Sequence, residues 1–146
     1  MKSDFISEIK RAFSAELPDA ELFVYDTVGS TSDEARKHAL SGGGNAFFIA
    51  REQTLGRGRR GRSFISREGG LYLSYLLHPA LSARDAVMLT VFSAVALAEA
   101  VEETSGADVK IKWVNDLFLG GKKLAGILAE GEFTDDAEQF KYAVVG

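Results

Sequence analysis

Short apolar runs of strand length recur along this chain, and they narrow its fold more than any other feature. They predict strands over residues 22–28, 46–50, 71–77, 109–113, 117–119, 123–132 and 140–145. Gly120-Gly121 lies between two of these runs and predicts a two-residue hairpin turn. Interleaved helical patterns then favour an α+β fold: a mixed, largely antiparallel sheet with helices packed on one side.

Three segments have helical periodicity. Residues 4–16 read as an amphipathic helix that ends before Pro18. Thr31 and Glu34 form a capping-box pattern, which predicts a helix that begins at Thr31 and ends at the glycines 42–44. Ser82 and Asp85 predict the start of a third helix that runs to about Thr104. Apolar residues surround most of its circumference, so we expect it to be the central buried helix.

Composition limits the classes of protein to consider. The chain has 146 residues, 46% of them hydrophobic, which suits one domain with a real core over residues 1–146. A net charge of −4 argues against a general nucleic-acid binder. The absence of cysteine excludes disulfides and thiolate chemistry. Charged residues interrupt the apolar ones at the start of the chain, so we expect no membrane segment and a cytoplasmic location.

The most unusual segment is the arginine–glycine loop, residues 56–62, with the sequence GRGRRGR. Arginine is rarely buried without a partner, so core packing does not explain four of them here. Glycines allow close approach of the backbone to a ligand, and guanidinium groups pair with phosphate or carboxylate. The loop therefore predicts an anion-binding site, with a solvated or RNA-binding loop as the alternative. Its like charges also predict that it is mobile without an anion.

Two further segments carry polar groups at strand ends. Asn115 and Asp116 follow the 109–113 run, where they either project into a cleft or form an ordinary turn. Lys123 lies beside the hairpin turn, and Gly126 lies within the returning strand. A strand glycine often marks the close approach of a ligand, whereas a lysine at such an edge is often only solvated.

Taken together, these segments resemble the biotin protein ligase family. The matching pieces are Ser30-Thr31-Ser32, Gln53, the GRGRRG of residues 56–61, the LYLS of 71–74, the KWVND of 112–116 and the KLAGIL of 123–128. The resemblance implies a fold shared with lipoate ligases. It also implies an activity: Mg²⁺, ATP and biotin give biotinyl-5′-AMP, and biotin then passes to a lysine of a biotin carboxyl-carrier protein.

The resemblance also implies roles for individual residues. The biotin-binding residues would be Ser30, Thr31, Gln53, Arg57, Gly58, Arg59, Lys123 and Gly126. The ATP-binding residues would be Arg57, Arg59, Arg62, Phe64, Lys112, Asn115 and Asp116. Arg57, Arg59 and Lys123 would be catalytic, and Asp116 would contact Mg²⁺ through water.

Other expectations concern the extent of the chain. It stops at Gly146 within a strand-like run, so we expect a catalytic domain that is incomplete at its C-terminal end. The family normally continues into a small C-terminal β-domain, and we expect neither this domain nor an N-terminal DNA-binding domain here; a homodimer stays open. Three alternatives remain: a lipoate-type ligase or transferase, an inactive fragment that binds biotin or nucleotide, and an RNA-binding module.

Overall fold

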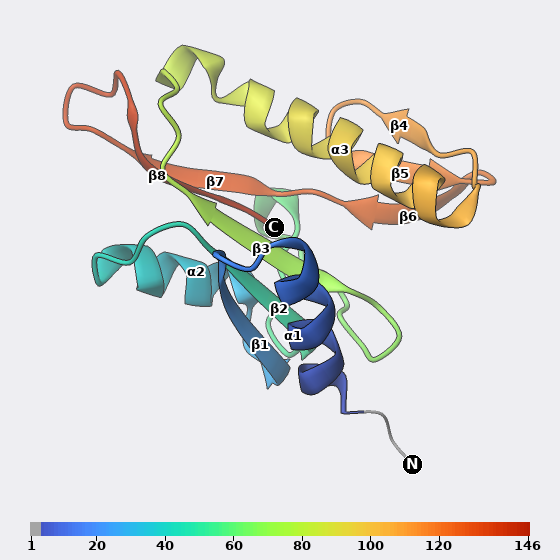
Figure 1. Ribbon diagram of the computed structural model, residues 1–146. Helices are drawn as coiled ribbons and strands as arrows, with labels where there is room; N and C mark the ends of the chain where they lie inside the picture. The colour runs from blue at the N-terminus through green and yellow to red at the C-terminus, as the bar shows by residue number, and fades with distance from the viewer. Residues whose placement is uncertain (1–3) are drawn as a thin grey trace.

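The computed structural model describes residues 4–146 and divides the strands between two sheets (Figure 1). The larger sheet has the order β1-β2-β3-β8-β7, with β1 and β2 parallel and the other pairs antiparallel. Its strands are β1 (Glu21–Val28), β2 (Ala46–Gln53), β3 (Tyr72–Leu77), β7 (Ala129–Phe133) and β8 (Phe140–Val145). The smaller sheet is antiparallel and contains β4 (Lys110–Lys112), β5 (Asp116–Leu119) and β6 (Lys122–Gly126). The expected fold class is confirmed.

The first two helices differ from expectation in one respect, because they pack on opposite faces of the larger sheet. Helix α1 (Phe5–Glu16) places Phe13 against Phe47, with ring centroids 4.9 Å apart. Helix α2 (Thr31–Leu40) buries Ala35 in the core that contains Phe48. Successive residues of a strand project to opposite faces, so Phe47 and Phe48 each anchor one helix. The apolar run in β2 thus serves two layers.

Helix α2 begins at Thr31 as expected, but its N-cap lies one residue before the Thr31 of the capping-box pattern. Ser30 is its N-cap, and the Ser30 hydroxyl accepts a hydrogen bond from the Asp33 amide at 3.4 Å. The expectation that Thr31 caps the helix is therefore wrong. The Thr31 side chain instead bonds Gln53 and Ser74, two residues of the larger sheet. This shift frees the Thr31 hydroxyl for the site described below.

The expectation of a central buried helix is also wrong. Helix α3 (Val87–Ser105) follows a short 3₁₀ turn capped by Ser82 and ends at Gly106, which has φ 69°. Ala94 and Ala98 are buried, but Phe92 is 59% exposed. The pattern of apolar residues in a sequence predicts a helix, but it does not show whether another layer of the fold covers each apolar face of that helix. Helix α3 packs one face, with Ala94 and Ala98, on the smaller sheet, and the face that carries Phe92 stays exposed.

The predicted returning strand 123–132 is in fact two strands in two sheets. It divides after Gly126, where the Ile127 amide donates to the Asn115 carbonyl at 2.8 Å. Leu128 then exchanges two backbone hydrogen bonds with Gly146, beyond the end of β8. The chain thus crosses from the smaller sheet to the larger one without a turn (Figure 1). The predicted Gly120-Gly121 turn is confirmed, with φ values of 55° and 78°.

Two separate groups of buried side chains hold these layers together. One group centres on Phe48 and Leu76 between α2 and the larger sheet. The other centres on Leu117 and Ile127 between α3 and the smaller sheet. Within residues 4–146, no helix combines the length and the apolar character needed to cross a bilayer.

Candidate functional site

A cavity of about 1100 Å³ lies where the two sheets, α3 and the arginine–glycine loop meet. Its apolar walls come from the face of the larger sheet that carries Phe47 and Tyr75, and from Phe92 and Leu97 of α3. Nearly all residues predicted for the site line this cavity: Ser30, Thr31, Gln53, Arg57, Gly58, Arg59, Arg62, Phe64, Asn115, Asp116, Lys123 and Gly126. Segments up to about 95 residues apart in the sequence thus converge on one hollow.

Lys112 is the exception among the predicted residues. It does not belong to the cavity lining, and its ammonium nitrogen lies 5.4 Å from the centroid of the Phe118 ring. In the antiparallel ladder of β4 and β5, the backbone of Lys112 lies opposite that of Asp116. The structure therefore brings its neighbours Asn115 and Asp116 to the cavity without Lys112 itself.

A chain of hydrogen-bonded polar groups forms one end of the cavity. The Gln53 carbonyl oxygen accepts from both the amide and the hydroxyl of Thr31, at 2.8 and 3.0 Å. The hydroxyl of Ser74 lies 2.7 Å from that of Thr31 and 2.9 Å from that of Ser32. The Gln53 amide nitrogen donates to Ser66 at 3.0 Å. Because these side chains fix one another, they present an ordered set of donors and acceptors to a small polar ligand.

The arginine–glycine loop folds back on itself as a narrow ribbon, with its two sides joined by backbone hydrogen bonds. The Phe64 amide donates to the Gly56 carbonyl at 2.8 Å, and the Gly58 amide donates to the Arg62 carbonyl at 2.7 Å. A Cβ at Gly56 would lie 2.4 Å from the Phe64 carbonyl oxygen, so the two sides meet only with glycine there. The predicted loop therefore has a defined backbone, with its tip at residues 59–61.

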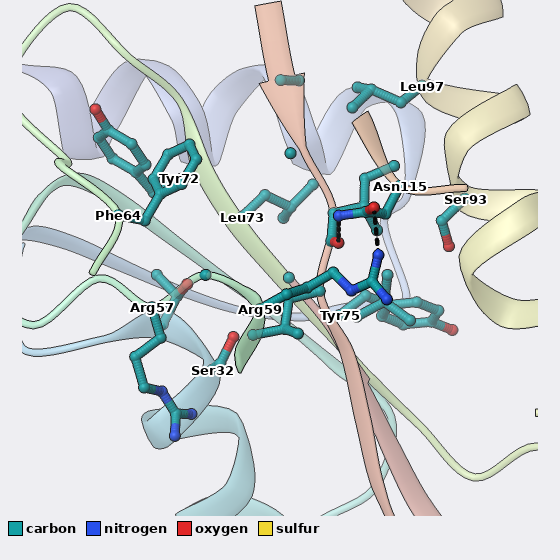
Figure 2. Close-up of a pocket in the computed structure, with 18 of the residues that line it drawn as sticks. Ser32, Arg57, Arg59, Phe64, Tyr72, Leu73, Tyr75, Ser93, Leu97 and Asn115 are labelled. Carbon is teal, nitrogen blue, oxygen red and sulfur yellow. Dashed lines mark hydrogen bonds between the residues drawn. The ribbon is translucent and has the colours of Figure 1, made fainter. Parts of the chain in front are cut away.

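The arginines of the ribbon have different surroundings. Arg59 donates to the Asn115 side-chain oxygen at 2.8 Å, which joins the loop to the start of β5 (Figure 2). The guanidinium of Arg57 points away from Arg59 in the same view and pairs with Asp33 and Glu130. Arg59 therefore faces a neutral partner, whereas two carboxylates balance the charge of Arg57.

Lys123 brings a further cation to the cavity, from β6 instead of from the loop. Its ammonium lies 2.9 Å from Asp116 and 5.9 Å from the centroid of the Phe64 ring. A Cβ at Gly126 would lie 3.2 Å from both Cε and Nζ of Lys123, and 3.4 Å from Phe64. The glycine thus leaves room for the lysine side chain beside the cavity wall, as a strand glycine near a ligand site would.

Several residues of the site had no role predicted for them from the sequence. Ser74 and Ser66 are almost completely buried and complete the polar network. Ser74 was detectable in principle, since this polar residue lies two positions before the buried Leu76 and therefore on the same face of the strand. Asp33 and Glu130 were not, because only the folded chain brings α2 and β7 to the arginine of a distant loop.

A metal ion finds few ligands in this part of the molecule. No cluster of three or more His, Cys, Asp or Glu side chains with metal-binding geometry exists among residues 4–146. Asp116 offers one carboxylate at the cavity, already paired with Lys123. Mg²⁺ commonly binds through one or two carboxylates together with substrate phosphates and water. The residues therefore suit only a Mg²⁺ that arrives with a phosphorylated ligand.

Comparison with known sequences gives consistent results. The model of the biotin/lipoate A/B protein ligase family matches residues 31–144. The bifunctional ligase/repressor BirA of Bacillus subtilis is 35% identical over 132 residues, which cover 89% of this chain and 41% of BirA. The biotin–[acetyl-CoA-carboxylase] ligase of Paracoccus denitrificans is 43% identical over 103 residues, 69% of this chain and 43% of that enzyme. The chain thus spans about two fifths of the length of these relatives.

Solved structures give the same picture of the fold. A biotin protein ligase of Leishmania major in complex with biotinyl-5-AMP has a TM-score of 0.70 and 28% identity, over 86% of this chain and 55% of that one. A biotin protein ligase of Aquifex aeolicus in complex with biotin and ATP has a TM-score of 0.59 and 30% identity, over 86% and 51%. Both therefore share the fold of this chain over 86% of its length.

Proposed function

Because this chain belongs to the biotin/lipoate A/B protein ligase family, we propose that it is the catalytic core of an ATP-dependent biotin protein ligase. It would make biotinyl-5′-AMP from biotin and ATP, and then pass biotin to a lysine of a biotin carboxyl-carrier protein. The observation that carries the proposal is that Arg57, Arg59 and Lys123 line one cavity. An arrangement with these cations around separate cavities would have contradicted it.

The first step requires two anions to meet. A carboxylate oxygen of biotin attacks the α-phosphorus of ATP, a new C(O)–O–P bond forms, and the bond to pyrophosphate breaks. Repulsion between carboxylate and phosphate opposes this encounter, and fixed cations around both reduce it. We assign this role to Arg59 and Lys123, since they approach the cavity from the loop and from β6. Arg57 borders the same region with its charge already paired.

The polar end of the cavity would hold the ureido group of biotin. A ureido group has two N–H donors and one carbonyl acceptor, and the network around Thr31 and Gln53 offers both kinds of partner. Ser30 belongs to the same end, and the backbones of Gly58 and Gly126 would border the ligand. A set of buried polar groups discriminates strongly against ligands that leave them unpaired.

The nucleotide would occupy the part of the cavity between the arginine–glycine loop and the start of β5. Phe64 offers an aromatic face, and Asn115 offers a side-chain amide for a base. Arg62 would contact the outgoing phosphates. Asp116 would contact a nucleotide-borne Mg²⁺ through water, and the ion would supply additional positive charge at the phosphates. That contact requires Lys123 to exchange Asp116 for the reacting anions.

A lipoate-type ligase or transferase is the second candidate, because the family includes both substrates. Lipoate has no ureido group, so it would form none of the hydrogen bonds that a ureido group would form with the network around Thr31 and Gln53. A site arranged to hydrogen-bond a ligand binds an analogue without those bonding groups much less tightly. The polar end of the cavity therefore favours biotin.

Product identification tests the proposal. We expect the protein, incubated with Mg²⁺, ATP and biotin, to yield biotinyl-5′-AMP by mass spectrometry, and to yield far less acyl-adenylate with lipoate. An adenylate from lipoate alone would replace the biotin assignment with the second candidate. Stabilisation by biotin against heat without any adenylate would assign binding without catalysis to this chain.

A further inference from the structure

The surroundings of Arg57 differ from those of an arginine held ready for a ligand. Its Nη2 atom lies 2.8 Å from Oδ1 of Asp33 and 3.1 Å from Oε2 of Glu130. Arg36 approaches the same Glu130 oxygen at 3.6 Å. Two arginines thus face two carboxylates, and the group is close to neutral without any ligand.

The three elements that meet here are distant in the sequence. Asp33 lies in the first turn of α2, Glu130 lies in β7, and Arg57 belongs to the ribbon. Arg57 also forms an isolated bridge with Ser63 on the other side of the ribbon. Within the described chain, the side-chain hydrogen bonds and ion pairs that leave residues 56–62 are those of Arg57 and of Arg59. One end of the ribbon is therefore fastened through this ion-pair group.

We propose that Asp33 and Glu130 are positioning residues, which hold the arginine–glycine loop in its binding geometry before any ligand arrives by pairing with Arg57. The two carboxylates supply the negative charge that a cluster of arginines requires for order. The loop would then be ordered in the free protein, contrary to the mobility expected from its sequence alone.

The consequence for ligand binding follows from the order of events. A loop that is already placed loses little conformational freedom when biotin or ATP binds, so affinity is higher than for a mobile loop. Once the ligand is bound, the loop is in place whether or not the carboxylates hold it. The proposal, which here rests on the proposed ligase function, therefore predicts a change in KM for biotin with little change in kcat.

Exposure limits the size of the effect. The side chains of Arg57, Asp33 and Glu130 are 36%, 37% and 31% exposed, so water and salt screen these pairs. Because both pairs act on one guanidinium, we expect the double variant Asp33→Asn/Glu130→Gln to show the main effect. We predict a roughly ten-fold change, which corresponds to about 1.4 kcal/mol.

Amide hydrogen exchange of residues 56–62 in the ligand-free protein is the direct test. We expect exchange to be roughly ten-fold faster in the double variant, because loss of the two ion pairs of Arg57 should lower the free energy of opening of the loop by about 1.4 kcal/mol. In the parent, high salt should accelerate exchange, whereas the double variant should respond little. Two controls remove similar charges elsewhere: Glu34→Gln in the same turn of α2, paired with Lys37, and Glu132→Gln in β7, paired with Lys141. The conservative variant Asp33→Glu keeps the carboxylate, so residues 56–62 should keep much of the protection from exchange that they have in the parent.

The outcomes separate this proposal from the ligase assignment. Unchanged exchange in the double variant, or equal acceleration in both controls, would overturn the positioning role even if the protein makes biotinyl-5′-AMP. Faster loop exchange would support the role even if no adenylate forms. A roughly ten-fold higher KM for biotin with kcat within about two-fold completes the support, and a fall in kcat alone would contradict it.

Discussion

At the scale of single residues, the site depends on polar groups that the fold buries and then pairs. Ser30, Thr31 and Ser74 are each 3% exposed or less, yet their hydroxyls have partners within the chain. Burial without partners costs free energy, and removal of one partner leaves the others unsatisfied. The orientation of the Gln53 and Thr31 side chains therefore depends on their hydrogen-bond partners Ser66 and Ser74.

Substitution of Ser74 tests this dependence. Ser74→Ala removes the oxygen that lies 2.7 Å from the Thr31 hydroxyl and 2.9 Å from the Ser32 hydroxyl. We expect the free energy of unfolding to fall by about 1–3 kcal/mol in urea titrations. Ser105→Ala, which removes an exposed hydroxyl bonded to the Val101 carbonyl, should change it by less than about 0.5 kcal/mol. Equal losses in the two variants would show that burial does not make loss of a hydroxyl in this network more costly than loss of an exposed one.

At the scale of elements, local chemistry in the sequence predicts most boundaries. The helix over 4–16, the glycine hairpin and the strand over 140–145 all appear within a residue or so of their expected bounds. What it does not predict is how elements share layers. The apolar surface of α3 predicted full burial, and residues 123–132 read as one strand, because both outcomes depend on contacts with distant segments.

The same limit applies to the site. Motifs located the cations and Gln53, but the pairing of Arg57 with Asp33 and Glu130 depends on the fold. Lys112 shows the reverse case. It lies within a motif, yet the register of β4 and β5 leaves its ammonium over Phe118.

The end of α3 offers a test at this scale. Gly106 has φ 69°, a conformation that costs a residue with a Cβ about 1–2 kcal/mol. We expect Gly106→Ala to lower the free energy of unfolding by about that amount. Gly44→Ala, at a loop position with open space around the added Cβ, should leave it unchanged or slightly higher. A Gly106→Ala protein as stable as the parent would contradict the role of this glycine as the helix terminator.

At the scale of the whole molecule, the cavity joins two separately packed halves. The polar network belongs to the larger sheet, whereas Asn115, Asp116 and Lys123 belong to the smaller sheet or its entry. Each half has its own buried side chains, with Phe48 and Leu76 in one and Leu117 and Ile127 in the other. Alignment of the two halves therefore determines whether the polar network lies close to Asn115, Asp116 and Lys123.

Substitutions in the two cores should act on different halves. Leu117 is completely buried, and Leu117→Ala should cost about 2–5 kcal/mol. We expect amide exchange to accelerate more in β4, β5 and β6 than in β1, β2 and β3, because stability is distributed in local units. Leu76→Ala, equally buried in the other core, should give the reverse pattern. Uniform acceleration in both variants would show one cooperative unit instead.

The adenylation rates of Arg59→Ala, Lys123→Ala and the double variant test the central electrostatic claim most directly. Each single change should lower biotinyl-5′-AMP formation by roughly 10²–10³-fold, by analogy with the loss of one preorganised charge-stabilising group. The double variant should lose less than the product of the two, because both cations act on the same anions. Lys110→Ala, which removes an exposed cation paired with Asp108, should keep the parent rate. Folded Arg59→Ala and Lys123→Ala proteins that form the adenylate as fast as the parent would contradict the claim.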